Sequence, residues 1–599
     1  MPPTKHPTEA RRPRPRLVEL LVVLVWAALV VHADFYVAHF GSPVASRDDL
    51  ELLLAFEPQA GFTDIARHFW NPLNEHRIPL SQWIHFGAVS WSNDFRAGGH
   101  VQVGLLALTA LAGILTVRRL RGRTCVEDVL FPLLLLHWSN GENLLLGTQI
   151  CVALALFLTT IAGCACAWAP GAPSARRISV VGACLLLLPW CGGFGLCPSP
   201  AIAAWIAVAA WRARREGRVR DGWLAAGVLL AYAACLALYF HDLAWPERPP
   251  FERRLDVGAG IVAQVLSMTF GGIAPFEPWS AIPAALVLLG VATGYGVAGL
   301  RRGGEQGWRG FGVVVIVAGV LLLALSIAWA RQNDWPYAGW APRYALAPSP
   351  LAFAAVFAVV SLGGKLVARA FPIALALLLA AAMPLHVERG RWMAEQAELI
   401  LRPFLNSVAS DMTIDELART YAGWLYADED GLRARLVAMR EARLPPYDHL
   451  VDGPAVEASK LVERPIVLEA AATREDRVLA GLEVIGVAAP ARLCVALRED
   501  ARFAAGRVGV LPIAYVRDTP DEAHTLGVRC RIVQEREGRG PLELLRRDFR
   551  PLEFKSDRGL HAFQVELAPG GGRLLLLVES LTNERPGTDW LGWTRLEVR

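Results

Sequence analysis

The chain has 599 residues, of which 54% are hydrophobic and 19% are charged, and its mean hydropathy is +0.35. These values are high for a soluble globular protein, and the length predicts more than one domain. The net charge of +4 is small for this length, and no basic stripe with interleaved aromatic residues occurs. The sequence therefore argues against a nucleic-acid partner.

The first apolar run, residues 17–31, directly follows a group of four arginines, Arg11, Arg12, Arg14 and Arg16. Basic residues before an apolar run are also typical of a signal peptide. The run is long, however, and no convincing A-x-A cleavage site follows it, so we expect a retained first membrane helix.

Apolar runs then recur as far as about Leu385. Because a membrane-spanning helix needs about 20 mainly apolar residues, we predict an α-helical polytopic membrane protein with about eleven spans. Residues 257–275 are apolar but rich in glycine, which favours a re-entrant or interfacial helix. The predicted spans are 17–33, 99–117, 125–138, 145–168, 178–193, 198–211, 222–240, 278–299, 310–330, 349–364 and 370–385.

Basic clusters between these spans predict the orientation. With these spans, six clusters fall on one side, which the positive-inside rule makes cytoplasmic. Arg253-Arg254 is the exception, because it falls in an outer loop. We therefore expect a multi-pass protein of the inner or plasma membrane, with a cytoplasmic N-terminus and an extracytoplasmic (periplasmic) C-terminal domain. The six clusters are Arg11–Arg16, Arg118–Arg123, Arg176–Arg177, Arg212–Arg220, Arg301–Arg309 and Lys365–Arg369.

The first predicted outer loop, residues 34–98, has the densest group of polar residues in the chain. It contains the acidic pair Asp48-Asp49 and, further on, Asn74-Glu75-His76-Arg77 before Pro79-Leu80. Residues 80–92 are amphipathic and suit a membrane surface.

Transfer of a sugar from a phosphate leaving group needs a base that takes a proton from the acceptor hydroxyl, and positive charge that offsets the charge on the departing phosphate. Asp48 or Asp49 could supply the base. Two simpler interpretations stay open, a solvated turn or helix cap at the acidic pair and a salt bridge between Glu75 and Arg77. Candidates for the positive charge are a bound metal, His76, Arg77 and Arg343.

Two later outer loops carry further candidates. The polar residues 137–143 interrupt an apolar run that is too long for one helix, so they are predicted to form an outer turn. A charge in the bilayer core costs about 2.5–3.5 kcal/mol, so Glu142 belongs at the interface or in a polar cavity. Arg343-Tyr344 precedes the tenth span, and the planar fork of arginine binds phosphate well. A simple polar turn and an interfacial Arg-Tyr anchor are the alternatives.

The order of a span, an acidic pair, an aromatic-Asn-Pro element, a polar cluster and a Pro-Leu-x-x-Trp element before an interfacial helix resembles the GT-C-type glycosyltransferases. In two branches of that family, the protein O-mannosyltransferases and the lipid A aminoarabinose transferases, an acidic residue in this loop is catalytic. By position, Asp48 or Asp49 matches their catalytic acidic residue, and residues 78–83 match their Pro-Leu element. Residues 74–77 depart from their Pro-rich or Lys-Pro stretch and resemble a bacterial subgroup with an Asn-Glu-His-Arg motif, which leaves donor and acceptor open.

The resemblance implies roles for the later loops. The family has an acidic or amide residue in the second outer loop near the active site, which corresponds to Glu142 or Asn143. It also has an arginine in a late outer loop that contacts the lipid phosphate, which corresponds to Arg343.

We therefore expect a glycosyltransferase that moves a sugar from a polyprenyl-phosphate-linked donor in the lipid bilayer to an extracytoplasmic glycan, lipid or protein acceptor. Asn74, Glu75, His76 and Arg77 would shape the acceptor or phosphate site. A divalent metal, Mg²⁺ or Mn²⁺, is one option, with Asp48, Asp49 and Glu75 as candidate ligands. A transporter or flippase, which would use broken helices with charges near the midplane, and a non-catalytic envelope scaffold are the alternatives.

The sequence predicts three domains: a membrane domain at 1–385, an extracytoplasmic helical linker at 386–450 and an all-β, jelly-roll-like sandwich at 451–599. Asp411 is a plausible helix N-cap. A hairpin turn is predicted at Pro569–Gly572, and Cys494 and Cys530 are either a disulfide or two buried thiols. The predicted strands are 465–471, 493–498, 508–515, 528–534, 562–567 and 573–578, with a last strand after 589–593.

Overall fold

The computed structural model divides the chain into two compact units. The helical unit comprises Met1–Pro43 and Phe62–Ala394, and the C-terminal unit comprises Val44–Gly61 and Glu395–Arg599. The residues that the structure describes are 15–56, 60–73, 75–168, 171–243, 254–333, 336–409, 412–423, 425–444, 446–448, 450, 467–471, 474–479, 482–488, 491–497, 499, 501–510, 527–536, 538–551, 557, 559–581 and 590–598.

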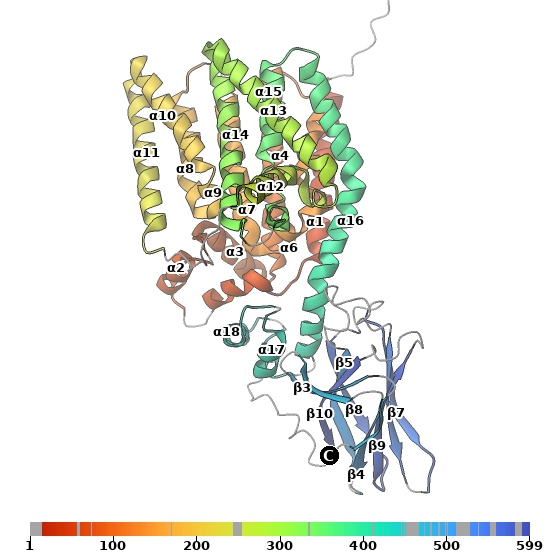
Figure 1. Cartoon of the computed structure of the whole chain (residues 1–599). Coiled ribbons are helices and arrows are strands. Elements are labelled where there is room, and N and C mark those ends of the chain that lie inside the picture. Colours follow the sequence, from red (N-terminus) through yellow and green to blue (C-terminus); the bar gives the residue numbers. More distant parts are fainter. Residues whose placement is uncertain are drawn as a thin grey trace, which may run out of the picture. The chain divides into compact units, whose positions relative to one another are not determined.

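Within the described residues, nine helices are long and apolar enough to cross a membrane, judged by length and composition. The chain is therefore a polytopic membrane protein, and α13, α14 and α15 (Pro350–Leu362) pack side by side in its helical unit (Figure 1). Six of these spans are single helices, α1 (Pro15–Phe40), α4 (Arg96–Arg121), α11 (Val219–Phe240), α13 (Pro278–Arg302), α14 (Gly304–Arg331) and α16 (Val367–Ala409). The other three combine a helix with a short neighbouring one, and their main helices are α7 (Ile150–Ala167), α10 (Ser199–Arg215) and α12 (Leu255–Ser267).

Proline and glycine set several helix ends. Proline occupies the first turn of α3 (Pro79–Ser92), α13 and α15, where its missing N–H costs no helical hydrogen bond. Gly122 ends α4 with φ at 77°, and Gly303 turns the chain between α13 and α14 with φ at 68°. Residues with a side chain rarely adopt these positive φ values.

Two of the predicted spans, 125–138 and 178–193, consist of short helices in the structure. In the first, α5 (Leu130–Leu135) ends at Leu136 and His137 is extended, so only short helices follow, η3 (Trp138–Asn140), α6 (Gly141–Leu145) and η4 (Gly147–Gln149). In the second, α8 (Ala175–Leu187) passes into η5 (Leu188–Cys191), which ends at Gly192 with φ at 68°. Polar residues break the first helix and a positive-φ glycine stops the second.

The predicted re-entrant segment 257–275 overlaps α12 and η6 (Met268–Ile273), which together satisfy the length and composition of a span. Gly271 kinks this segment, with φ at 76° and ψ at −168°. Whether the segment crosses the membrane or re-enters it stays a prediction.

The basic clusters of the helical unit are joined by contacts at helix ends. At the first residues of α1, Glu19 pairs with Arg118 near the end of α4, at 3.2 Å. Arg119 lies 4.4 Å above the ring of Trp168, just after α7. At the end of α13, Arg302 Nη1 donates to the carbonyl of Leu362, the last residue of α15, at 3.1 Å.

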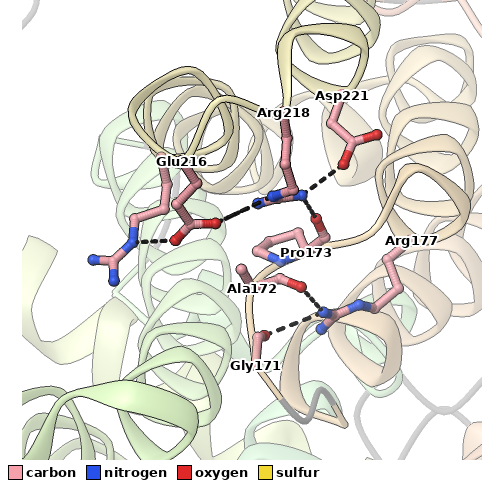
Figure 2. A network of polar contacts seen from close by, with 8 residues as sticks. Gly171, Ala172, Pro173, Arg177, Glu216, Arg218 and Asp221 are labelled. Carbon is pink, nitrogen blue, oxygen red and sulfur yellow. Dashed lines mark hydrogen bonds and ion pairs between the residues drawn. The ribbon is translucent and has the colours of Figure 1, made fainter.

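A polar network ties the α10–α11 turn to the loop between α7 and α8 (Figure 2). Arg218 Nη1 donates to the carbonyl of Pro173 at 2.7 Å and to Asp221 at 2.6 Å. Arg177 Nη2 donates to the carbonyl of Ala172 at 2.6 Å. These contacts bring the clusters at 118–123, 176–177, 212–220 and 301–309 to one end of the helical unit, in agreement with the predicted arrangement. Arg11–Arg14 lie outside the described residues. Arg254 lies beside Gln332, at the opposite end of α14, as expected for the exception.

The C-terminal unit contains α17 (Ile414–Tyr421), α18 (Glu429–Glu441), η1 (Arg47–Phe56) and two five-stranded antiparallel sheets. The sheet orders are β1-β4-β9-β6-β7 and β2-β3-β10-β5-β8. One buried core takes side chains from both sheets, such as Leu493 and Leu576 from the first and Val508 and Trp593 from the second. The strands are β1 (Val467–Ala471), β2 (Arg474–Leu479), β3 (Leu482–Ala488), β4 (Ala491–Leu497), β5 (Phe503–Val510), β6 (Val528–Glu535), β7 (Leu542–Phe549), β8 (Gly559–Glu566), β9 (Gly572–Ser580) and β10 (Trp590–Val598).

The predicted hairpin at Pro569–Gly572 is wrong. The turn exists, with positive φ at Gly570 and Gly571, but β8 pairs with β5 whereas β9 pairs with β4 and β6. The turn therefore connects the two sheets, because the apolar faces of β8 and β9 both contribute to the core between them.

Two smaller predictions in this unit also have an outcome. The N-cap of α17 is Thr413, in a capping box with Glu416, and Asp411 lies outside the described residues. Cys494 and Cys530 are buried, and neither forms a disulfide. They belong to β4 and β6, which β9 separates, so their sulfur atoms are too far apart for a disulfide.

Candidate functional site

The loop after α2 (Phe62–Trp70) is closed by two backbone hydrogen bonds, Leu73 N–H to the His76 carbonyl at 2.8 Å and His76 N–H to the Leu73 carbonyl at 3.1 Å. Glu75 is half-buried and His76 is exposed, and Asn74 lies outside the described residues. The His76 ring packs against Gly193, where an added Cβ would lie 3.0 Å from His76 Cε1. The loop is thereby attached to the short helix α9 (Gly193–Leu196).

Arg77 anchors the same loop. Its side chain is buried, Nη1 donates to the carbonyl of Leu238 near the end of α11 at 3.1 Å, and the guanidinium lies 5.1 Å from the centre of the Trp70 ring. This geometry gives Arg77 a structural function. Its proposed part in phosphate binding stays a prediction.

The second and third candidate loops contact each other. Asn143 is fully buried, and its Nδ2 lies 3.5 Å from the carbonyl of Pro342, at the outer limit of a hydrogen bond. Glu142 is half-buried. The η8 turn (Pro342–Tyr344) presents Arg343 as an exposed side chain and buries Tyr344.

These loops form one continuous group through α9. The Phe194 and Tyr344 rings lie 6.0 Å apart, so contacts run from His76 through Gly193 and Phe194 to Tyr344, and from Pro342 to Asn143. We call this group the polar end. It lies at the C-terminal end of α14, whereas Arg301–Arg309 surround its start, and the 28 residues of α14 extend over about 42 Å.

A pocket lies directly beside the polar end and shares Phe194 with it. Its enclosed volume is only about 10 Å³, about what one water molecule needs, and the rest is open to the surroundings. Thr159 supplies the only hydroxyl among its lining side chains. The lining residues are Val152, Ala155, Leu156, Thr159, Phe194, Pro198, Gly319, Val320, Leu323, Ala347 and Pro350.

The acidic pair belongs to the C-terminal unit, in η1. Asp49 is buried and Asp48 is half-buried. The carboxylate that positions this helix is Glu51, which accepts hydrogen bonds from Tyr426 at 2.6 Å and from Arg435 at 2.5 Å. Sequence reasoning did not identify this residue. Burial, together with the nearby Glu51, raises the pKa of Tyr426 to about 12.

The candidate site residues are distributed over both units of the chain. Asp48 and Asp49 are in one unit, and the polar end is in the other, so a site formed by both stays a prediction. In the described part of the chain, no group of three or more His, Cys, Asp and Glu residues is arranged to hold a metal ion. Metal binding by Asp48, Asp49 and Glu75 likewise stays a prediction.

The fold and these features define a polytopic membrane protein that has a C-terminal β region. No protein-family model and no curated protein matches the chain. Among solved structures, the chain is similar to the arabinosyltransferase EmbB from Mycobacterium smegmatis, with 12% identity and a TM-score of 0.32 over 99% of this chain and 66% of that one. The chain thus spans just under two thirds of that protein, and a similarity of this size carries no argument about activity.

Proposed function

We propose that the protein is a membrane glycosyltransferase that uses a polyprenyl-phosphate-linked sugar. The observation that carries this proposal is that apolar side chains lie directly beside the polar end, with Phe194 in contact with both. A lipid-linked donor needs this combination, because its chain is apolar and its phosphate and sugar are polar. The sequence resemblance to GT-C-type enzymes points to the same chemistry.

In this proposal the lipid chain lies against the apolar side chains beside Phe194, and the phosphate lies near Arg343. Arg343 is exposed at the end of η8, and its guanidinium can form two hydrogen bonds to phosphate oxygens. Glu75 and His76 would contact the phosphate or the acceptor.

Asp48 or Asp49 would take the proton of the acceptor hydroxyl. The acceptor oxygen then forms a bond to the anomeric carbon, and the bond from that carbon to the phosphate oxygen breaks, so that the electron pair leaves with the polyprenyl phosphate. Positive charge from Arg343, or from a divalent metal, offsets the charge on this leaving group. The β-sandwich would cap the membrane domain or position the acceptor.

The basic clusters support the orientation of this reaction. They gather at the end of the helical unit that lies opposite the polar end. The positive-inside rule assigns the basic end to the cytoplasm, so the polar end would face the outside of an inner or plasma membrane and the acceptor would be extracytoplasmic.

A transporter of lipid-linked glycan is the second candidate, because the helical unit contains broken helices. The chain between α5 and α7 is interrupted several times, and Gly271 kinks η6. Broken helices form the substrate sites of many transporters. The transferase is favoured because the exposed charges of the polar end lie in loops beyond the helix ends.

Mass spectrometry of envelope glycans and lipid-linked sugars, in cells with and without the gene, tests the proposal. A transferase predicts a missing sugar on the acceptor and accumulation of the lipid-linked donor. A transporter predicts that the donor accumulates on the cytoplasmic side. Unchanged glycans and donors would refute both and leave a non-catalytic scaffold.

A further inference from the structure

Three buried polar side chains that the proposed reaction does not use lie together in the helical unit. They are His137 and Ser139, from the turn after α5, and His386, from α16, and all three have 0% exposure. The two imidazole rings stack with centroids 3.8 Å apart and planes 12° apart. Ser139 Oγ lies 3.0 Å from Nδ1 of His137 and 2.7 Å from Nδ1 of His386.

The hydroxyl of Ser139 restricts the protonation of both rings. A serine hydroxyl has one proton and two lone pairs, and the backbone N–H of Gly272 donates to Ser139 Oγ at 3.2 Å. One lone pair and one proton are then left for two histidines. One ring must therefore donate Nδ1–H to the hydroxyl while the other accepts the hydroxyl proton, so the two rings hold opposite neutral tautomers.

Neighbouring elements approach this turn without leaving space for a larger side chain. Trp138 Nε1 donates to the carbonyl of His32 in α1 at 2.8 Å. A Cβ added to Gly390 of α16 would lie 2.3 Å from Trp138 Cβ, and one added to Gly271 would lie 2.4 Å from His137 Cε1. The turn is therefore held by α1, η6 and α16 at once.

The turn formed by His137, Trp138 and Ser139 leads directly into the polar end. Asn140 Nδ2 donates to the carbonyl of Leu135 at 2.9 Å and closes the end of α5, and Glu142 and Asn143 follow within three residues. The Nε2 atoms of His137 and His386 are buried without a hydrogen-bond partner among the described residues. Unsatisfied buried nitrogens destabilise a fold, and an apolar cluster of the same size would avoid them, so a packing function alone does not explain these three residues.

We propose that Ser139 and His386 are positioning residues, which fix the turn so that Glu142 and Asn143 face the Pro342–Tyr344 loop. We call the hydrogen bonds from Ser139 Oγ to Nδ1 of His137 and of His386 the clamp. It requires opposite neutral tautomers of the two rings. The inference rests on the proposed transferase function, which it deepens by assigning the residues that hold one wall of the site.

Two amide substitutions at His386 distinguish this proposal from a simple packing role. The amide of asparagine takes the place of Nδ1, and the amide of glutamine takes the place of Nε2. We expect His386→Asn to transfer sugar at nearly the wild-type rate, whereas His386→Gln and Ser139→Ala lose about tenfold to 100-fold in kcat with little change in KM for the lipid donor. Gel filtration and thermal unfolding of each full-length variant identify any that fails to fold.

The reverse pattern, an active His386→Gln and an inactive His386→Asn, would overturn the proposal by assigning the function to Nε2. Equal rates in all variants would overturn it as well.

Nitrogen-15 NMR of the full chain with labelled histidine supplies a readout that does not depend on sugar transfer. We expect one ring protonated at Nδ1 and one at Nε2 in the wild type, and loss of this pair of signals in Ser139→Ala. Identical tautomers in an active wild type would refute the clamp alone. Opposite tautomers in a wild type that transfers no sugar would refute the proposed function and, with it, the positioning role.

Discussion

Glu51 and Arg435 form an ion pair within the C-terminal unit, in which Arg435 Nη2 donates to Glu51 Oε2 at 2.5 Å. The other carboxylate oxygen accepts a hydrogen bond from the Tyr426 hydroxyl at 2.6 Å, and the Arg435 guanidinium lies 3.9 Å from the centre of the Tyr426 ring. This pair attaches η1, which carries Asp48 and Asp49, to α18. The position of the proposed base therefore depends on a carboxylate that has no part in the reaction.

Replacement of Glu51 should loosen η1. Glu51→Ala removes two hydrogen bonds to a partly buried carboxylate, so we expect a loss of about 1.5–3 kcal/mol in the local opening free energy. Hydrogen exchange of residues 47–56 in the full chain measures it. Glu543→Ala is the matched control, because its pair with Arg531 is more exposed and lies in β6 and β7. Equal exchange of η1 in both variants would contradict the attachment.

Arg343→Ala should lower the rate of sugar transfer by about 100-fold or more, because the departing phosphate loses its positive charge. Arg343→Lys should recover only part of the loss, since lysine lacks the planar fork. Arg301→Ala changes an exposed arginine at the opposite end of α14 and is the control. A similar small effect of Arg343→Ala and Arg301→Ala on kcat/KM would exclude Arg343 from phosphate binding.

Cysteines placed at the polar end and at the opposite end of the helical unit, where the arginine clusters lie, should be labelled from opposite sides of the membrane. A cysteine at Arg343 should be labelled by a membrane-impermeant thiol reagent added outside intact cells, whereas a cysteine at Gln306 should require permeabilised cells. Both native side chains are exposed. Labelling of both cysteines from outside, or of Gln306→Cys alone, would contradict the orientation.

Stability should fall in mild acid because of His85. Burial lowers the pKa of His85 in α3 to about 4, below the value of about 6.5 for an unfolded chain. Protonation therefore favours the unfolded state, so stability is complete above pH 6.5 and falls as the pH drops towards 4. The melting temperature of the full chain across this range measures the effect, and His85→Gln should flatten the profile. The exposed His241→Gln should leave it unchanged; a flat wild-type profile would contradict the prediction.

The sequence predicted the class of fold because hydropathy and charge are strong local signals. The positions of the spans, and the side on which the arginine clusters fall, can be read from composition along the chain. The contacts of Arg118, Arg218 and Arg302 agree with the predicted placement of these clusters on one side. The helix break at His137 was expected as an outer turn. Its clamp was not expected, because His386 lies 247 residues from Ser139 and no local pattern relates them.

The candidate site could be predicted only in part. The motifs pointed to Glu75–Arg77, Glu142–Asn143 and Arg343–Tyr344, and the structure joins these loops through Gly193 and Phe194. The contact between Arg77 and Leu238 and the pairing of Glu51 with Arg435 depend on tertiary packing. The sheet pairing of β8 was missed because a glycine turn has the same local pattern whether it closes a hairpin or connects two sheets.

The most direct test of the proposed function is sugar transfer by the purified full-length protein in proteoliposomes. The donors would be synthetic polyprenyl-phosphate pentoses and hexoses, and the acceptors would be an envelope glycan extract. We expect transfer by the wild type, and a loss of about 100-fold or more in the fully folded Asp48→Asn/Asp49→Asn double variant, because asparagine cannot act as the base. Transfer by the double variant at the wild-type rate would contradict the assigned base, and absence of transfer from every donor would contradict the glycosyltransferase itself.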